Sequence, residues 1–199
     1  SWQCKRVILS TMKLKSCLRS FIFLILLFLV FSKAIAGPSF VQSKSIDIGF
    51  YLGLTFNNDG TKMYTAESDK TSDAIVEYIL TTAYDISTAT VNNTKIVHRG
   101  SGKNAIVPTQ VVFNNDGTKM FIANHLGSEQ IQYWSLSTAF DISTATFNDV
   151  EDISSQEERV NSIAFNNDGT RMIVAGAGGG SQHRIHEYSL STGFDLSST

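Results

Sequence analysis

Cysteine is nearly absent from this sequence, and so are several patterns that would point to a reaction. The chain has two cysteines, Cys4 and Cys17, and both precede residue 37. Residues 37–199 therefore have no internal disulfide bond and no thiolate chemistry. They show no sustained 3.6-residue periodicity of apolar residues, which excludes a helical repeat protein. They also contain no nucleophile elbow, no cluster of metal-ligating residue types and no Ser-His-Asp set with a recognisable spacing.

Acidic residues are missing from the N-terminal region. The first 36 residues contain six of the 16 basic residues and none of the 18 acidic ones. Residues 37–199 therefore carry ten basic and 18 acidic residues, a formal net charge of −8. A surface of this sign repels nucleic acid and anionic lipid. We expect neither as a partner.

A short apolar run marks the N-terminal region. Eleven uninterrupted apolar residues span Phe21–Phe31, after a basic stretch and before Ala34-Ile35-Ala36. As a helix the run is about 16 Å long, roughly half the thickness of a hydrocarbon core. The pattern predicts a signal peptide region over 1–36, with translation starting at Met12 and cleavage after Ala36. The mature chain is then secreted, periplasmic or on the cell surface, with no membrane span; an uncleaved anchor is the alternative.

An octapeptide repeats three times after residue 37. Its copies span Phe56–Met63, Phe113–Met120 and Phe165–Met172. The first two copies are identical, and the third has Arg171 in place of lysine. Three tyrosines follow the copies at a constant spacing of 55 residues: Tyr78, Tyr133 and Tyr188. Self-similarity at a period of about 50 residues is typical of repeat architectures, so the search for the fold starts here.

Each unit predicts four short antiparallel strands. The Asp-Gly pair inside Asn-Asn-Asp-Gly favours a tight hairpin between the first two strands. The third strand alternates polar and apolar residues, and a weaker fourth strand follows a segment of the type Phe-Asp-Ile-Ser-Thr. Four such strands per unit are typical of a β-propeller blade. We therefore expect an all-β chain with about three blade-equivalents, and because propellers close with roughly four to eight blades, we expect a larger propeller.

The expected boundaries follow from the repeat. A partial propeller occupies 37–199, with units around 54–97, 111–153 and 163–199 and with 40–48 as a leading fourth strand. The expected third strands are Ile75–Leu80, Ile131–Leu136 and Ile185–Leu190, and the expected fourth strands are Val91–Val97 and Phe147–Ile153. We assign the three tyrosines, together with Phe56, Phe113 and Phe165, to packing between blades.

The repeated string resembles the Phe-Ser-Pro-Asp-Gly core of TolB-type, YVTN-type and WD-like propeller repeats. The resemblance covers essentially residues 40–199. The Gly-His and Trp-Asp dipeptides of WD repeats are absent, so the resemblance does not imply their intracellular scaffold role. Some similar propellers, of the lactonase and gluconolactonase types, hold a metal at the axis through Glu, Asn and Asp from different blades. We expect no cofactor in this chain, and the resemblance leaves a divalent metal in the complete propeller open.

Antiparallel strands sort the connections onto two rims. One rim carries the nearly invariant Asn-Asn-Asp-Gly turns, which we interpret as structural: Asp59, Gly60, Asp116, Gly117, Asp168 and Gly169. The other rim carries the variation in length and composition, and functional residues concentrate in varied loops on a rigid scaffold. We therefore expect a ligand on the second rim. The candidate binding residues are Glu67, Asp69, Asp73, His98, Arg99, Asn124, His125, Glu129, Glu157, Glu158 and His183.

Other motifs have structural explanations. Each turn supplies one Asp, whereas Ca²⁺ takes about six or more oxygen ligands. His183 and His186 are three apart in an expected strand and so point to opposite faces. The glycine-rich segment 176–180 lacks the strand-to-helix context of a phosphate-binding loop. Asn92-Asn93-Thr94 fits the glycosylation acceptor pattern, which matters only in a host that glycosylates exported proteins. We assign no catalytic or metal-binding residue.

These features favour an exported propeller that binds an unknown protein, glycan or small molecule without catalysis. A lactonase-type hydrolase with an axial divalent metal is the first alternative. A metal site built from several blades would be incomplete in three blades, so the lack of a recognisable metal motif here leaves this function open. A surface or adhesion repeat protein is the second. Dependence on a metal would distinguish the hydrolase from the binding module. The length of the complete reading frame would distinguish the adhesion repeat protein from both.

Overall fold

The structure is a computed structural model of the chain. It describes residues 38–45, 50–68, 73–97, 107–125, 129–156, 159–177 and 183–198. The chain divides into the units Ser1–Val41 and Gln42–Thr199, and every element below belongs to the second unit. The predicted signal region, 1–36, lies outside the described residues. In the part that the structure describes, no helix has the length and apolar character needed to cross a membrane.

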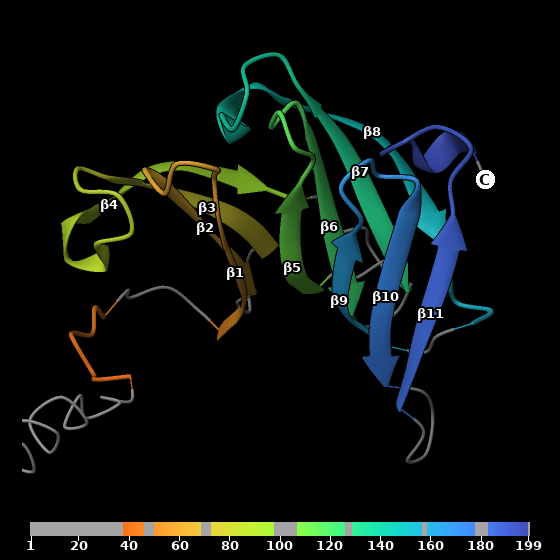
Figure 1. The fold of residues 1–199 in the computed structure, drawn as a ribbon, viewed down its shortest axis with the longest axis horizontal. Coiled ribbons are helices and arrows are strands. Elements are labelled where there is room, and N and C mark those ends of the chain that lie inside the picture. Colours follow the sequence, from red (N-terminus) through yellow and green to blue (C-terminus); the bar gives the residue numbers. More distant parts are fainter. Residues whose placement is uncertain are drawn as a thin grey trace, which may run out of the picture. The chain divides into compact units, whose positions relative to one another are not determined.

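Three antiparallel sheets form the described part of the second unit (Figure 1). In each sheet the strands lie in sequence order. The first sheet contains β1 (Phe50–Phe56), β2 (Lys62–Ser68), β3 (Asp73–Leu80) and β4 (Ala89–Ile96); the second contains β5 (Val107–Phe113), β6 (Lys119–His125), β7 (Gln130–Leu136) and β8 (Ala145–Asp152); the third contains β9 (Val160–Phe165), β10 (Arg171–Ala177) and β11 (His183–Ser189). Short 3₁₀ helices follow β3, β7 and β11: η1 (Ile86–Thr88), η2 (Ile142–Thr144) and η3 (Leu196–Ser198). The predicted all-β blade architecture is confirmed.

The strand bounds differ slightly from the expected ones. The third strand of each sheet begins one or two residues before the isoleucine that we expected to start it. The fourth strands, β4 and β8, begin two residues earlier than expected, at Ala89 and Ala145. Both alanines pair with the last residue of the preceding strand, since pairing starts directly after the 3₁₀ helix.

The leading segment departs further from expectation. Residues 40–48 were expected to form a fourth strand, but the described part, Phe40–Ser45, contains no strand. A strand here needs the third strand of another sheet as its neighbour, and the described residues provide none. The segment is held by side chains instead: Lys44 Nζ donates a hydrogen bond to the carbonyl of Ala89, where β4 begins.

The Asn-Asn-Asp-Gly turn is held by its own side chains. In the first sheet Asn57 Oδ1 accepts a hydrogen bond from the Lys62 N–H (2.9 Å). Asp59 Oδ1 accepts from the N–H (2.9 Å) and hydroxyl (2.6 Å) of Thr61. These bonds favour the ionised carboxylate, so they lower the pKa of Asp59, led by the bond from the Thr61 hydroxyl. The same bonds recur in the other two turns and lower the pKa of their aspartates.

An aromatic residue closes each turn. Tyr84, Phe140 and Phe194 have φ between 56° and 59°, which is unusual for bulky residues. Their N–H groups donate to the carbonyls of the turn glycines at 2.9–3.0 Å. Their rings lie directly over these glycines, where a Cβ would be 2.2 Å from a ring carbon. The turn therefore needs glycine both for a positive φ (72–73°) and for space.

The register of the sheets corrects the tyrosine alignment. Met63 pairs with Tyr78 and Met172 with Tyr188, but Met120 pairs with Trp134. The position of Tyr78 in the first sheet is therefore taken by Trp134 in the second. Tyr133 takes the position of Glu77 instead. The equivalent residues Tyr78, Trp134 and Tyr188 are 56 and 54 residues apart, so the constant spacing of 55 does not mark equivalent positions.

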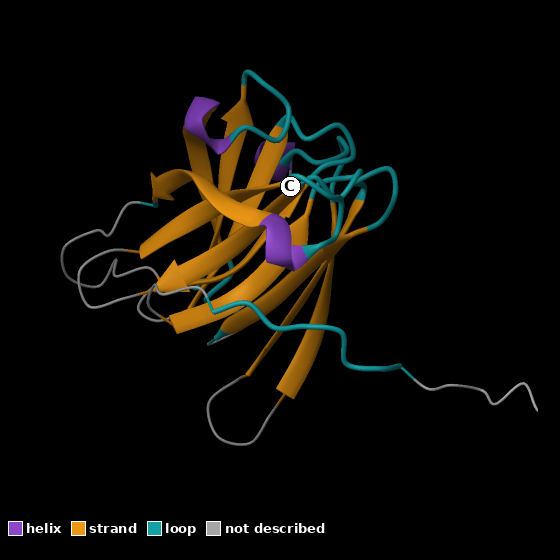
Figure 2. Ribbon diagram, turned by 90° about the vertical axis from the view of Figure 1, so that its left-hand side faces the viewer, coloured by secondary structure: helices purple, strands orange, loops and turns teal. Residues whose placement is uncertain are grey.

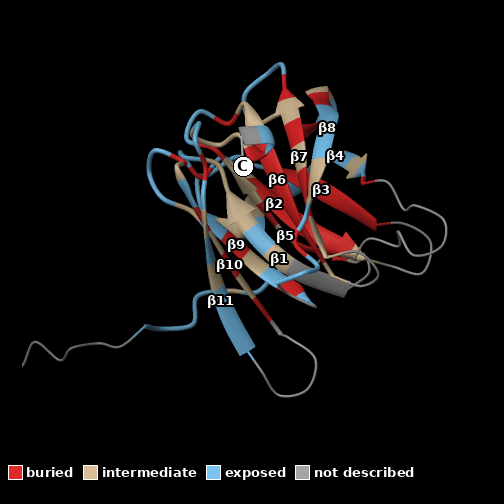
Figure 3. Cartoon of the chain, turned by 90° about the vertical axis from the view of Figure 1, so that its right-hand side faces the viewer, coloured by how far each residue is buried: buried red, intermediate tan, exposed pale blue. Residues whose placement is uncertain are grey.

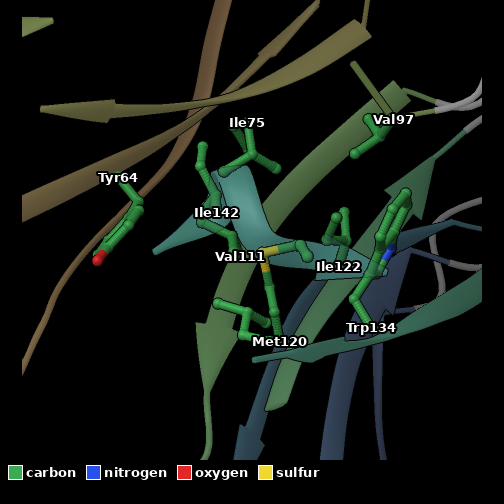
Figure 4. Packing of buried hydrophobic residues seen from close by; sticks show 11 residues of the cluster. Tyr64, Ile75, Val97, Val111, Met120, Ile122, Trp134 and Ile142 are labelled. Carbon is green, nitrogen blue, oxygen red and sulfur yellow. The ribbon is translucent and has the colours of Figure 1, made fainter. Parts of the chain in front are cut away.

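Neighbouring sheets share their cores. Tyr64, Ile75 and Val97 of the first sheet pack with residues of the second, including Val111 and Ile142 (Figure 4). A second cluster joins the second and third sheets in the same way. Phe113 contacts Tyr64 across one boundary (ring centroids 4.6 Å apart), and Phe165 contacts Phe121 across the next (4.6 Å). Phe56 instead contacts Tyr84 within its own sheet.

Candidate functional site

The two rims differ in structure as they do in sequence. The invariant turns and the 3₁₀ helices lie at one end of the strands (Figure 2). There the second asparagine of each turn reaches the next sheet: Asn58 Nδ2 donates to the carbonyl of Asn115 (2.7 Å), and Asn115 Nδ2 donates to that of Asn167. Lys62 Nζ donates to the Phe140 carbonyl at 2.8 Å. The polar groups of this rim are thus used to join sheets.

Six of the candidate binding residues on the varied rim are described. They come from the ends of the second strands and the starts of the third: Glu67, Asp73, Asn124, His125, Glu129 and His183. The other five lie outside the described residues: Asp69, His98, Arg99, Glu157 and Glu158. The candidate site can therefore be assessed sheet by sheet on the first six.

The first sheet uses its two acidic candidates internally. Glu67 and Asp73 are buried. Glu67 Oε1 accepts hydrogen bonds from the hydroxyls of Thr65 (2.5 Å) and Tyr78 (3.2 Å). Asp73 Oδ1 accepts from the hydroxyl of Ser68 at 2.7 Å. Both carboxylates therefore stabilise the end of the first sheet.

The second sheet presents a different arrangement at the same place. Asn124 is the fifth residue after Lys119, as Glu67 is after Lys62. Asn124 Nδ2 donates to the carbonyls of Ile122 and Gln130, both at 3.3 Å. Its Oδ1 is buried and has no hydrogen-bond partner in the described part of the chain. A buried carbonyl oxygen in this state costs about 1–3 kcal/mol, so Asn124 lowers the stability of this end of the second sheet.

His125 adjoins this oxygen in sequence and has a second buried atom of the same kind. Its Nδ1 is buried, and none of the described residues forms a hydrogen bond with it. Burial and, next, the charge of Arg159 lower the pKa of His125, while Glu129 acts in the opposite direction. The imidazole is therefore neutral at neutral pH. A neutral ring accepts a hydrogen bond at one nitrogen and donates at the other.

The third sheet contributes little in its described part. The position of Glu67 and Asn124 is occupied by Gly176, and His183 is exposed at the start of β11. Among residues with assigned positions, no three His, Cys, Asp or Glu side chains form a group that could hold a metal ion. The structure thus places the chemically unusual atoms of the varied rim in the second sheet.

Sequence reasoning missed Glu77, a fully buried carboxylate at the boundary of the first two sheets. Its Oε1 accepts from Asn92 Nδ2 (2.6 Å) and lies 3.2 Å from Lys62 Nζ. Its Oε2 accepts from the N–H of Ile142, at the start of η2 (3.0 Å). The Glu-Tyr pair in the third strand is the sequence feature that could have indicated this role. Neighbouring residues of a strand point to opposite faces, so Glu77 lies on the face opposite the buried Tyr78, toward the next sheet.

At the second boundary a small pocket replaces that carboxylate. Tyr133 occupies the Glu77 position and stacks on Phe121 (centroids 5.5 Å apart). The pocket is lined by Tyr133, Asp149, Val150, Glu151, Leu196 and Ser197, with a volume of about 40 Å³. Burial, followed by the neighbouring Asp152 and Asp149, raises the pKa of Glu151. Small-molecule sites usually measure hundreds of Å³, so this pocket holds water at most.

Comparison with known proteins rests on structure alone. No family model matches the chain, and no curated protein matches it. Among solved structures, it is similar to a candidate 6-phosphogluconolactonase from Bacteroides uniformis, with a TM-score of 0.52 and 13% identity over 71% of this chain. A second candidate 6-phosphogluconolactonase, from Bacteroides fragilis, gives a TM-score of 0.52 and 14% identity over 74% of this chain.

The chain is built of β-propeller blades. At these identities the similarity establishes the fold and nothing finer. The chain spans only 37–40% of the length of the two solved structures.

Proposed function

We propose that the protein is an exported propeller module that binds a ligand at its varied rim and catalyses no reaction itself. The observation that carries this proposal is the contrast between the rims. On the invariant rim the asparagine and lysine side chains bind neighbouring sheets. On the varied rim Asn124 Oδ1 and His125 Nδ1 are buried and have no hydrogen-bond partner among the residues that the structure describes. The first arrangement holds the scaffold together, and the second leaves hydrogen-bonding groups of the varied rim that the scaffold does not use.

The chemistry of the rim favours a neutral ligand rich in hydroxyl groups. Asn124 Oδ1 is an acceptor, and the lowered pKa of His125 keeps its ring uncharged. The formal charge of −8 over residues 37–199 disfavours phosphorylated or other anionic ligands. Sugars supply many donors without charge, so a glycan is the first ligand class to test.

The test combines a glycan array with paired variants. The exported protein is screened on the array, and the strongest ligand is titrated calorimetrically against wild type, His125→Ala and Asn58→Ala. Asn58 is an exposed residue of the invariant rim and is the control. We expect His125→Ala to weaken binding at least tenfold and Asn58→Ala to leave it within a factor of two. Binding to no glycan, or the reverse order of the two variants, would refute the proposal.

A lactone hydrolase is the second candidate, supported by the description of the two similar solved structures. In this function the acidic and amide side chains of several blades would hold a divalent metal at the axis. The assay measures hydrolysis of 6-phosphogluconolactone through the acid that it releases, titrated at constant pH. The hydrolase is favoured over the binding module if the protein raises the hydrolysis rate above that of buffer, EDTA abolishes this increase and a divalent metal restores it.

A further inference from the structure

The outer strand of one sheet meets the 3₁₀ helix of the next. β4 contacts η2, and β8 contacts η3 in the same way. β6 is buried along most of its length, whereas β8, on the outer side of the same sheet, is mostly exposed (Figure 3). Within β8, Ala145 is buried, and Val150 and Glu151 are half-buried. The outer strand therefore approaches the third sheet near Glu151.

Lysine ammonium groups satisfy the carbonyls at the ends of η1 and η2. Lys44 Nζ donates to the carbonyl of Ser87 at 3.2 Å and to that of Ala89. Lys95 Nζ, on β4, donates to the carbonyl of Ala145 at 2.6 Å. The two alanines directly follow η1 and η2. A cation with hydrogen-bond donors thus lies at the carbonyl end of both 3₁₀ helices.

Glu151 holds the position of Lys95 at the second boundary. Lys95 pairs with Ile75, and Glu151 pairs with Ile131. The two isoleucines are equivalent, because each pairs with the fifth residue of the second strand of its sheet. Glu151 lines the small pocket at this boundary together with Ser197 of η3. A carboxyl group therefore takes the place of an ammonium group beside the third 3₁₀ helix.

The neighbouring positions change in the same sense. Tyr133 replaces the buried carboxylate of Glu77, and Asp149 replaces Asn93. Asp149 and Glu151 are two residues apart in β8 and so share one face of the strand. Both line the pocket. The first boundary thus encloses one carboxylate, whereas the second carries two on its outer strand.

A carboxyl group can replace the lysine donor only in its neutral form. The Ser197 carbonyl corresponds to that of Ser87, since each serine is the second residue after the aspartate that precedes its 3₁₀ helix. A carboxylate has only acceptors and repels such a carbonyl, whereas a protonated carboxyl group has one O–H donor. Burial, followed by the charges of Asp152 and Asp149, raises the pKa of Glu151 from 4.5. The neutral form therefore persists to a higher pH than in an exposed glutamate.

The titratable and charged groups around Glu151 lie on its own strand and across the boundary. Within β8 they are Asp149 and Asp152. The groups that β6, the segment before η3 and the inward face of β11 contribute are Lys119, Asp195, Arg184, His186 and Tyr188. Serine hydroxyls hydrogen-bond to Asp152 and Asp195 and lower the pKa of both. Neither of these aspartates therefore takes up a proton before Glu151.

We propose that Glu151 makes the contact between the second and third sheets pH-dependent, tighter when its carboxyl group is neutral and weaker when it is ionised. A raised pKa means that the stabilisation is fully present below pH 4.5 and is lost as the pH rises through the raised value. The contact consists of β8 and η3, as the first boundary uses β4 and η2, so it is complete within the described chain. This inference is independent of the ligand-binding proposal.

Hydrogen exchange of Glu151→Gln against wild type tests the proposal. Glutamine keeps the shape of the neutral carboxyl group and cannot ionise. Amide protection factors in β9–β11 are measured for both proteins between about pH 4.5 and 7.5. We expect the ratio of variant to wild-type protection to rise at least about twofold from the acidic to the neutral end. A ratio that does not change with pH would overturn the proposal.

Glu187→Gln is the matched control. Glu187 belongs to the third sheet, and its side chain is 55% exposed beside Arg171. The same ratio for this variant should not rise with pH. A rise equal to that of Glu151→Gln would mean that any carboxylate removed from this acidic chain has the effect, and the proposal would then be wrong.

Exchanging the residues of the two boundaries tests the assignment in both directions. Glu151→Lys should remove the wild-type pH dependence of β9–β11, because an ammonium donor is then present throughout the range. Lys95→Glu should make the protection of β1–β4 fall with rising pH relative to wild type. A Glu151→Lys protein with the wild-type pH dependence would contradict the proposal.

A carbon-13 NMR titration of the Glu151 carboxyl group in the wild-type chain needs no variant to fold. We expect its pKa above the ordinary 4.5, together with pH-dependent shifts of the Leu196 and Ser197 amides that follow the same curve. A pKa at or below 4.5, or amides of η3 that do not respond, would overturn the proposal.

Discussion

Replacing Glu77 with alanine should destabilise the protein strongly, because this buried carboxylate joins the first two sheets. The substitution removes the acceptor of Asn92 Nδ2 and Ile142 N and the ion-pair partner of Lys62. Lys62 Nζ keeps its bond to the Phe140 carbonyl, but the Ile142 N–H stays buried without a partner. Breaking a buried ion pair costs about 3–5 kcal/mol. For a domain of this size that corresponds to a decrease in Tm of roughly 6–20 °C.

Glu187 supplies a matched control for this prediction. It occupies the Glu77 position in the third sheet and pairs with Arg171 at 2.6 Å, but both side chains are more than half exposed. Exposed ion pairs contribute about 0–1 kcal/mol. Thermal and urea unfolding of the two variants, followed by circular dichroism, measure the difference directly. Equal destabilisation by Glu77→Ala and Glu187→Ala would refute the argument that Glu77 joins the first two sheets.

Three further predictions concern the turns and the histidine. Gly117→Ala should lower the free energy of unfolding by about 2 kcal/mol or more, because φ is 72° and the new Cβ would lie 2.2 Å from the Phe140 ring. Urea unfolding measures this change, and a decrease below about 0.5 kcal/mol would be inconsistent with the geometry. The pKa of Asp116 is lowered from 3.8, so the folded state binds the carboxyl proton less tightly than the unfolded state does. The stability that this carboxylate contributes above pH 3.8 is therefore lost as the pH falls through the lowered pKa. Asp116→Asn should reduce this loss in unfolding curves recorded between about pH 2 and 5, and an unchanged pH dependence would count against the argument. The lowered pKa of His125 likewise means that the free energy of unfolding falls as the pH decreases below 6.5. His125→Gln should remove this part of the pH dependence. NMR titration of the imidazole checks the lowered pKa independently, and an unshifted pKa for His125 would contradict its buried environment.

The fold could be predicted because the repeat is unusually explicit. Asn-Asn-Asp-Gly specifies a hairpin through side-chain bonds and a positive-φ glycine, both local properties that survive in any context. The assignment of Phe113 and Phe165 to packing between blades followed from the same regularity, and the structure places both across boundaries. The division into an invariant and a varied rim required only the antiparallel order of the strands.

The remaining features depend on contacts that sequence spacing does not encode. The constant spacing of the tyrosines suggested that Tyr133 matches Tyr78, but loop length shifts the register so that Trp134 does. The expected strand around Lys44 needs a neighbouring strand that its own sequence cannot supply. The role of Glu77 depends on Ile142, whose N–H reaches the carboxylate from the next sheet, and no local pattern in the sequence shows that contact. At the candidate site, the lack of described hydrogen-bond partners at Asn124 Oδ1 and His125 Nδ1 is a property of packing.

The most direct test of the central claim is a calorimetric titration of one glycan ligand against the His125→Ala and Asn58→Ala proteins. If the varied rim binds ligands and the invariant rim holds the sheets together, His125→Ala binds at least tenfold more weakly than wild type and Asn58→Ala binds within a factor of two. If Asn58→Ala abolishes binding while His125→Ala binds normally, the roles assigned to the two rims are wrong.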